Sequence, residues 1–229
     1  MNNSARAVSR SQRRTAPPEQ RRVQLIQATI RSIARNGLAD TTMATVAREA
    51  GLSQGIINLH FKSKDRLLLE TLKYVVDEYR AVWEKALARE YDTAAEQLAA
   101  LVRVDFDASL VDRDKLAVWF AFWGEIKSRP TYRKLCAERD LDYEEKIRLL
   151  CVEIAKQGGY DVDPDKVAWG VSAMSEGLWL DLLLSPRRIN RDDAYRLCMV
   201  HLAGAFPRHF GPPGDPKPLG VEQANKDKK

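Results

Sequence analysis

Cysteine and histidine, the residues most often found in metal and redox sites, are scarce in this chain of 229 residues. They are Cys136, Cys151, Cys198, His60, His201 and His209. Their spacing matches no metal-ligand pattern, and the sequence contains no nucleophile elbow or phosphate-binding loop. We therefore predict no catalytic residue, no metal site and no cofactor, and we expect the cysteines to be buried, reduced thiols of a cytoplasmic protein.

Long apolar runs are also missing. No stretch approaches the roughly 18 apolar residues of a membrane-spanning helix, so we expect no membrane partner. The N-terminus lacks the apolar core of a signal peptide. Val, Ile and Thr rarely alternate with polar residues, whereas apolar residues recur three and four positions apart. These patterns predict an all-α protein, long enough for one large or two small domains.

Acidic residues are few in the first part of the chain. Residues 1–66 hold 12 Lys/Arg and 4 Asp/Glu, a net charge of +8, while the whole chain has a net charge of +5. The rest of the chain, with 25 basic and 28 acidic residues, is therefore net −3. Positive charge gathered at one end favours binding to phosphates.

The stretch from Thr42 to Asp65 predicts two short helices, a tight turn and the start of a third helix. Thr42 is placed to cap the first helix, Gly51 to end it in the left-handed conformation, and Ser53 to cap the second. One face of the second helix, Gln54–Phe61, is small or polar and comprises Gln54, Gly55, Asn58 and His60. Such a face fits a major groove, where Gln and Asn pair with adenine edges. An ordinary helical hairpin inside a core is the alternative.

This stretch resembles the TetR-type bacterial repressors. The matching positions are Thr42, Val46, Ala47, Ala50, Gly51, Leu52, Ser53, Gly55, His60, Phe61, Lys64 and Asp65. The resemblance implies a three-helix DNA-binding domain, joined by a long helix to a helical domain that binds a small effector and dimerises. It also implies a homodimer on a pseudo-palindromic operator in double-stranded DNA.

Individual contacts to DNA can be assigned within this motif. We expect Gln54 and Asn58 to read bases, and Gly55 to let the backbone come close to them. The predicted phosphate contacts, which position the protein without reading sequence, are Thr42, Ser53, His60 and Lys64.

The domain boundaries follow from the neighbouring helices. A first helix from about Pro18 to Asn36, ended by Gly37, is expected to brace the motif. A long helix from Lys64 to about Glu90 joins the two parts, and we place the boundary inside it near Leu69. The expected segments are a disordered basic arm (1–18), a DNA-binding domain (19–68), an effector-binding and dimerisation domain (69–210) and a disordered tail (211–229). The arm either reaches into a minor groove or is a solvated tail.

Further helices are expected beyond Asp92. Their predicted ranges are Thr93 to about Leu110, Asp112 to about Ser128, Tyr132 to Gln157, Pro164 to about Ser185, and Asn190 to Pro207. Leu116–Trp123 is an unbroken apolar run, which must be buried on every side or line a cavity. In the helix from Pro164, Glu176 and Asp181 lie among apolar residues and need a cationic partner from the protein or from a ligand.

Aromatic faces beside a carboxylate attract quaternary ammonium ions. The predicted effector-binding residues are Trp119, Phe122, Trp123, Glu176 and Trp179. Plain core packing of these aromatic residues is the alternative.

Three short motifs resemble the BetI-type branch, the choline-responsive repressors of glycine-betaine synthesis. They are Gly55-Ile56-Ile57, W-F-A-F-W from Trp119, and G-L-W-L from Gly177, within a resemblance that covers about residues 20–207. The resemblance implies choline or a related quaternary ammonium as effector. The alternatives are a regulator that senses a different hydrophobic metabolite or drug, a partner-protein interface in this half, and an enzyme.

Small residues in the last two helices predict a dimer interface. Gly170, Ala173 and Gly177 permit close helix approach, and a twofold dimer reads two operator half-sites. The predicted interface residues are Val171, Met174, Leu178, Leu197 and His201. Packing within one domain is the alternative.

Overall fold

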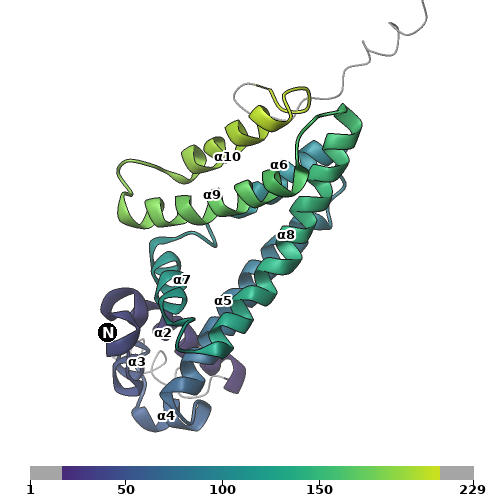
Figure 1. Cartoon of the computed structure of the whole chain (residues 1–229). Coiled ribbons are helices and arrows are strands. Elements are labelled where there is room, and N and C mark those ends of the chain that lie inside the picture. Colours follow the sequence, from purple (N-terminus) through teal and green to yellow (C-terminus); the bar gives the residue numbers. More distant parts are fainter. Residues whose placement is uncertain (1–16, 212–229) are drawn as a thin grey trace, which may run out of the picture. The chain divides into compact units, whose positions relative to one another are not determined.

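The computed structural model describes residues 17–211, without the side chains at positions 138–140 (Figure 1). Most of the predicted basic arm and of the predicted tail therefore lies outside the described residues. Within the described range, the secondary-structure elements from Pro18 to Ala205 are all α-helices, which confirms the all-α class. The chain divides into two compact units, Met1–Tyr74 and Val75–Lys229, and the division falls within helix α5 (Lys64–Leu87).

The first unit contains α2 (Pro18–Asp40), α3 (Met43–Glu49), α4 (Gln54–His60) and the beginning of α5. The predicted stop at Gly37 is a break with φ 76° and ψ 172°, after which helical structure resumes to Asp40. The buried core includes Leu25, Ile26, Ile57, Phe61 and Leu67. These apolar side chains fix α4 against the helices that carry it, because their burial is lost if α4 moves away.

Ion pairs add specificity around this small core. Arg31 and Arg35 of α2 donate to the Glu49 carboxylate at 2.8 and 2.9 Å, which ties α2 to α3. Glu70 of α5 pairs with Arg22 of α2 and, at 2.8 Å, with Arg66. Several arginines of this basic unit therefore serve the fold and are already paired.

The helices of the second unit after α5 are α6 (Ala94–Val104), α7 (Arg113–Glu125), α8 (Pro130–Gly158), α9 (Pro164–Leu184) and α10 (Arg191–Ala205). Side chains at Thr93, Asp112 and Asn190 cap their helices, and Gly159 ends α8 with φ 57°. Packed neighbours include α8 with α6 and α9, and α9 with α7 and α10. In Figure 1, α10 runs alongside α9.

Helix α6 is shorter than predicted, because the chain turns after Val104 instead of continuing to about Leu110. Asp107 explains part of the turn: its carboxylate accepts hydrogen bonds from the backbone N–H and the hydroxyl of Ser109, at 2.8 and 2.6 Å. Local side-chain bonds of this kind compete with helical ones. The turn follows directly on Asp105, the C-cap of α6.

Helix α9 is more apolar than we expected from the sequence. By length and composition it could cross a membrane, with a mean hydropathy of 1.2. Core packing accounts for much of this character, because Val171 and Trp179 are 0% and 3% exposed and α9 contacts α7, α8 and α10. A helix in the core of a helical domain can have the same length and mean hydropathy as a membrane-spanning helix.

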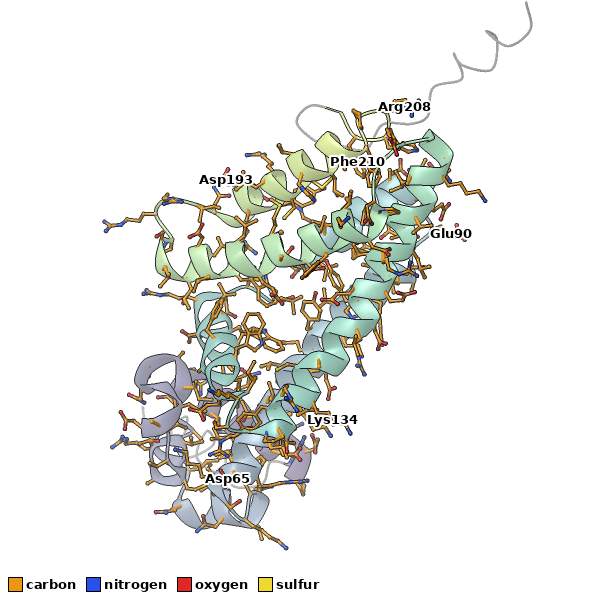
Figure 2. The ribbon with its side chains drawn as sticks, viewed as in Figure 1. Asp65, Glu90, Lys134, Asp193, Arg208 and Phe210 are labelled. Carbon is orange, nitrogen blue, oxygen red and sulfur yellow. The ribbon has the colours of Figure 1, made fainter. Side chains whose placement is uncertain are left out.

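The segment after α10 packs into the second unit. Phe206 and Phe210 are buried, and the Tyr160 ring lies 5.4 Å from Phe206. The Tyr160 hydroxyl is 2.9 Å from His209 Nδ1. Figure 2 shows Arg208 and Phe210 beyond the end of α10.

Candidate DNA interface and effector pocket

The turn between α3 and α4 forms largely as predicted. The Thr42 hydroxyl accepts the Thr45 N–H at 3.1 Å, while Thr45 Oγ1 accepts the Thr42 N–H at 2.8 Å. Gly51 adopts the left-handed conformation with φ 66°. Ser53 occupies the N-cap of α4, but its side chain makes no capping hydrogen bond, so the prediction was wrong on this point.

Helix α4 has one outward face and one packed face. Gln54, Gly55 and Asn58 are exposed, whereas Ile57 is 0% exposed. At 3.6 residues per turn, Gln54 and Asn58 lie one above the other on the outward face. The side chains predicted to read bases are therefore available to a groove.

The predicted phosphate contacts have different surroundings. Thr42 and Ser53 are exposed. His60 is half-buried, with its ring 6.5 Å from that of Phe61, and helical spacing puts it on the side of the buried Ile57. Its expected place on the exposed polar face was therefore wrong. The Lys64 ammonium donates to the Ala39 carbonyl oxygen at 2.7 Å. An ammonium has three donors, so Lys64 retains capacity for a phosphate.

Three of the predicted effector-binding residues form one aromatic cluster in the second unit. Trp123 stacks on Trp179 at 6.1 Å with an interplanar angle of 9°, and Trp119 lies 6.2 Å from each of them. Phe122 points elsewhere, packing edge-on against Tyr132 at 5.1 Å. The structure thus joins α7 and α9 through tryptophans and leaves Phe122 outside the cluster.

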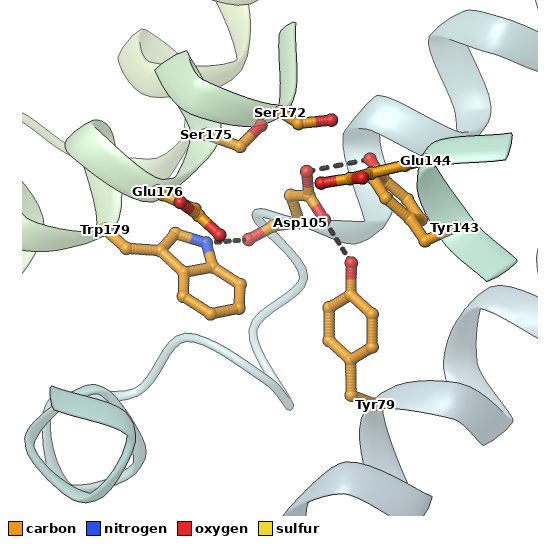
Figure 3. A pocket seen from close by; sticks show the side chains of 8 residues that line it. All are labelled: Tyr79, Asp105, Tyr143, Glu144, Ser172, Ser175, Glu176 and Trp179. Atoms are coloured by element: carbon orange, nitrogen blue, oxygen red, sulfur yellow. Dashed lines mark hydrogen bonds between the residues drawn. The ribbon is translucent and has the colours of Figure 1, made fainter. Parts of the chain in front are cut away.

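Beside this cluster, a buried carboxylate organises a pocket (Figure 3). Asp105 is 3% exposed, and the hydroxyls of Tyr79 and Tyr143 donate to its two carboxylate oxygens at 2.6 and 2.8 Å. The Trp179 indole N–H donates to the Asp105 backbone carbonyl at 2.7 Å. Four chain segments therefore meet at one residue.

The pocket has a volume of about 30 Å³. Its lining residues are Tyr79, Asp105, Tyr143, Glu144, Ser172, Ser175, Glu176 and Trp179. Burial raises the pKa of Tyr143 well above its usual value, and the Asp105 carboxylate raises it further. The Tyr143 phenol consequently stays protonated and remains a donor to Asp105 at physiological pH.

The buried acid of the pocket is not one of the two carboxylates expected from the sequence, so that expectation was wrong. Glu176 lines the pocket but is exposed, and Asp181 is half-buried, 3.9 Å from Arg188. Asp105 is the buried carboxylate, and it was missed together with Tyr79 and Tyr143. One signal was present: Asp105 stands between the apolar residues Val104 and Phe106.

A wider groove adjoins the pocket, because Glu144 and Ser172 line both. Its volume is about 390 Å³, and it also includes Leu141, Glu145, Arg148, Asp165, Ala168 and Trp169. Arg148 donates to Glu145 at 2.7 Å and to Asp165 at 3.4 Å. The described lining of the groove thus contains more acidic than basic side chains.

The predicted dimer residues divide between inside and outside. Val171 and Leu178 are 0% and 8% exposed in one protomer, so they pack its core, and Met174 and His201 are half-buried. A Cβ at Gly170 would lie 2.8 Å from His201 Nε2, which agrees with close packing of α9 and α10 within the domain. Leu197 is exposed. Other exposed apolar residues of these helices are Trp169, Leu180, Leu184 and Val200.

Two short helices joined by a tight turn, with the second helix exposed, are the geometry of a helix-turn-helix DNA-binding protein. More specifically, the chain belongs to the tetR family of bacterial regulatory proteins, whose pattern matches residues 25–71. The pattern of the C-terminal part of BetI-type transcriptional repressors matches residues 94–207. Both matches confirm the resemblance inferred from the sequence.

Individual relatives agree with this assignment. The HTH-type transcriptional regulator BetI of Burkholderia thailandensis is 35% identical over 165 residues, which cover 71% of this chain and 81% of the relative. A regulator from Paraburkholderia phymatum with the same name is 35% identical over 180 residues, covering 78% of this chain and 89% of the relative. The family consists of DNA-binding regulators, which confirms that the chain is not an enzyme.

Solved structures show the same fold. The crystal structure of a transcriptional regulator from Pseudomonas aeruginosa PAO1 has a TM-score of 0.72 and 29% identity, covering 83% of this chain and 92% of that one. A regulator from Saccharomonospora viridis, crystallised in complex with choline, has a TM-score of 0.70 and 28% identity, covering 79% of this chain and 94% of that one.

Proposed function

We propose that this regulator is a homodimeric repressor whose effector is choline or a closely related quaternary ammonium. It would bind a pseudo-palindromic operator in the cytoplasm and control the conversion of choline to glycine betaine. The single observation that carries the proposal is the buried Asp105 carboxylate between Tyr79, Tyr143 and Trp179. The names of the relatives and the choline complex of one structural neighbour support it.

The chemistry of the pocket suits such a cation. A trimethylammonium group cannot donate a hydrogen bond from its nitrogen, so aromatic faces and a carboxylate are its best partners. A desolvated cation–π contact contributes about 2 kcal/mol, and Asp105 adds a Coulombic attraction. Glu144 and Glu176, which are both exposed, supply two further acidic groups in the pocket lining.

Effector binding requires the pocket to open. A volume of about 30 Å³ has room for about two or three water molecules, so an organic cation must displace pocket side chains. Tyr79 belongs to α5, the helix that begins at Lys64 directly after the proposed reading helix. We propose that displacement of Tyr79 moves α5 and thereby changes the separation of the two α4 helices in the dimer. A coupling of about 1.4 to 2.8 kcal/mol would alter operator affinity about 10- to 100-fold.

The proposed functional division is a DNA-binding part, 19–68, and an effector-binding and dimerisation part, 69–210. The exposed apolar residues of α9 and α10 are a suitable surface for a second copy, including Leu184 at 69% and Val200 at 55% exposure. Two copies are needed because one α4 reads only one half-site. In each half-site, Gln54 and Asn58 of one copy would read bases.

The test uses the full chain and its tryptophan fluorescence. Choline, betaine aldehyde and an uncharged hydrophobic drug are titrated separately, and operator affinity is measured with each. We expect saturable quenching by the quaternary ammonium compounds and a matching loss of operator affinity. Tight binding of the uncharged drug alone would instead favour a regulator that senses hydrophobic compounds. A matched control is Asp107→Asn, which alters an acid in the same turn but outside the pocket lining.

A further inference from the structure

The outward face of α4 also carries an apolar residue, which has no part in the polar contacts to DNA proposed above. Leu59 is 80% exposed, the most exposed of the large hydrophobic residues in the described part of the chain. Single exposed leucines are common on protein surfaces, so exposure alone implies nothing. The position of Leu59 matters more, because α4 is the helix that we propose enters the major groove.

Helical spacing divides the outward face of α4 into two rows. Gln54 and Asn58, four residues apart, form a polar row. Gly55 and Leu59, also four residues apart, form a second row beside it. Gly55 is exposed, and a Cβ built there would meet only Ser53 Oγ, at 3.8 Å. The space next to the Leu59 side chain is therefore open to an approaching surface.

The fold does not need Leu59. The packed side of α4 is already occupied by Ile57, at 0% exposure, with Phe61 at 1% directly after the helix. Leucine at position 59 leaves its methyl groups in water, where they gain nothing from packing. A partner surface that buries them would recover that free energy.

The major groove offers one apolar feature, the C5-methyl group of thymine. We infer that Leu59 is a specificity-determining residue that packs on a thymine methyl in each operator half-site, with Gly55 leaving room for the base edge. The inference rests on the proposed function, because it requires α4 to enter the major groove. The thymine lies next to the bases read by the Gln54 and Asn58 row.

The experiment isolates the methyl group. Full-length protein first selects its operator from a pool of randomised duplexes. Each thymine is then replaced by deoxyuridine, symmetrically in both half-sites, and Kd is measured by fluorescence anisotropy. Burial of one methyl group predicts a loss of about fourfold for one half-site and about fifteenfold for both.

The variant Leu59→Ala tests whether Leu59 is the residue that contacts the thymine methyl group. We expect it to bind the thymine and deoxyuridine operators equally, with an unchanged melting temperature because the leucine is exposed. The matched control is Leu149→Ala, which truncates an exposed leucine of α8 and should keep the full penalty at the same thymine.

Two results would overturn the inference while leaving the regulator function intact. One is a selected operator in which no deoxyuridine substitution weakens binding. The other is a penalty that persists in Leu59→Ala. Failure of the wild-type chain to select any sequence would overturn the DNA-reading function and this inference together.

Discussion

Replacing Asp105 by Asn tests the charge of the pocket while nearly preserving the shape of the side chain. The carboxylate is 3% exposed and accepts hydrogen bonds from two phenols at 2.6 and 2.8 Å. Charge-assisted bonds contribute about twice as much as neutral ones, so two weakened bonds cost about 1 to 2 kcal/mol. In a protein of this size that lowers Tm by about 2 to 8 °C.

The loss of effector affinity should be larger than the loss of stability. A cation about 5 Å from the carboxylate, at an effective dielectric constant of 20, interacts with it by about 3 kcal/mol. Removing that interaction raises Kd about 150-fold. The neutral ligand 3,3-dimethylbutanol has the shape of choline without its charge, and its affinity should change much less.

Isothermal titration calorimetry of wild-type protein and Asp105→Asn with both ligands provides the measurement. The variant Tyr143→Phe removes one phenolic donor but keeps the aromatic face, so it should lose far less choline affinity than Asp105→Asn. An equal loss of affinity for choline and for the neutral ligand in Asp105→Asn would refute the electrostatic argument. Asp105 would then only shape the pocket.

Three other predictions concern different parts of the molecule. Burial and the neighbouring Arg208 lower the pKa of His209. Below a pH of about 6.5 the unfolded chain therefore binds more protons than the folded chain. The free energy of unfolding should fall there as pH decreases, by up to about 1.4 kcal/mol per pH unit for this one group. Chemical denaturation of His209→Gln at several pH values should show a flatter profile, and an unchanged profile would assign the effect elsewhere. Lys64→Ala should weaken binding to all DNA sequences and reduce the salt slope by up to about one, whereas a loss confined to the operator would contradict a phosphate contact. Val200→Glu places a charge on a 55% exposed position of α10, so sedimentation should show folded monomers, and a persisting dimer would locate the interface elsewhere.

The sequence alone was sufficient for the features that depend on a few neighbouring residues. Thr42 caps α3 through a bond to a residue three positions away, and Gly51 has the positive φ that its residue type favours. Apart from the end of α6, the later helices lie close to their predicted ranges, because caps, glycines and apolar spacing are local signals. Ser53 marks a limit even here, since residue type predicts a cap position but not the bond its side chain makes.

Only the tertiary structure decided where the acid and its aromatic partners meet. Asp105 receives bonds from residues 26, 38 and 74 positions away, and no periodicity in the sequence encodes such contacts. The same holds for α9, where both sides of the helix are apolar and composition could not tell Val171, which is buried, from Leu184, which is exposed. Local hydrogen bonds select the helices, but the burial of one helix face depends on which other helices pack against it.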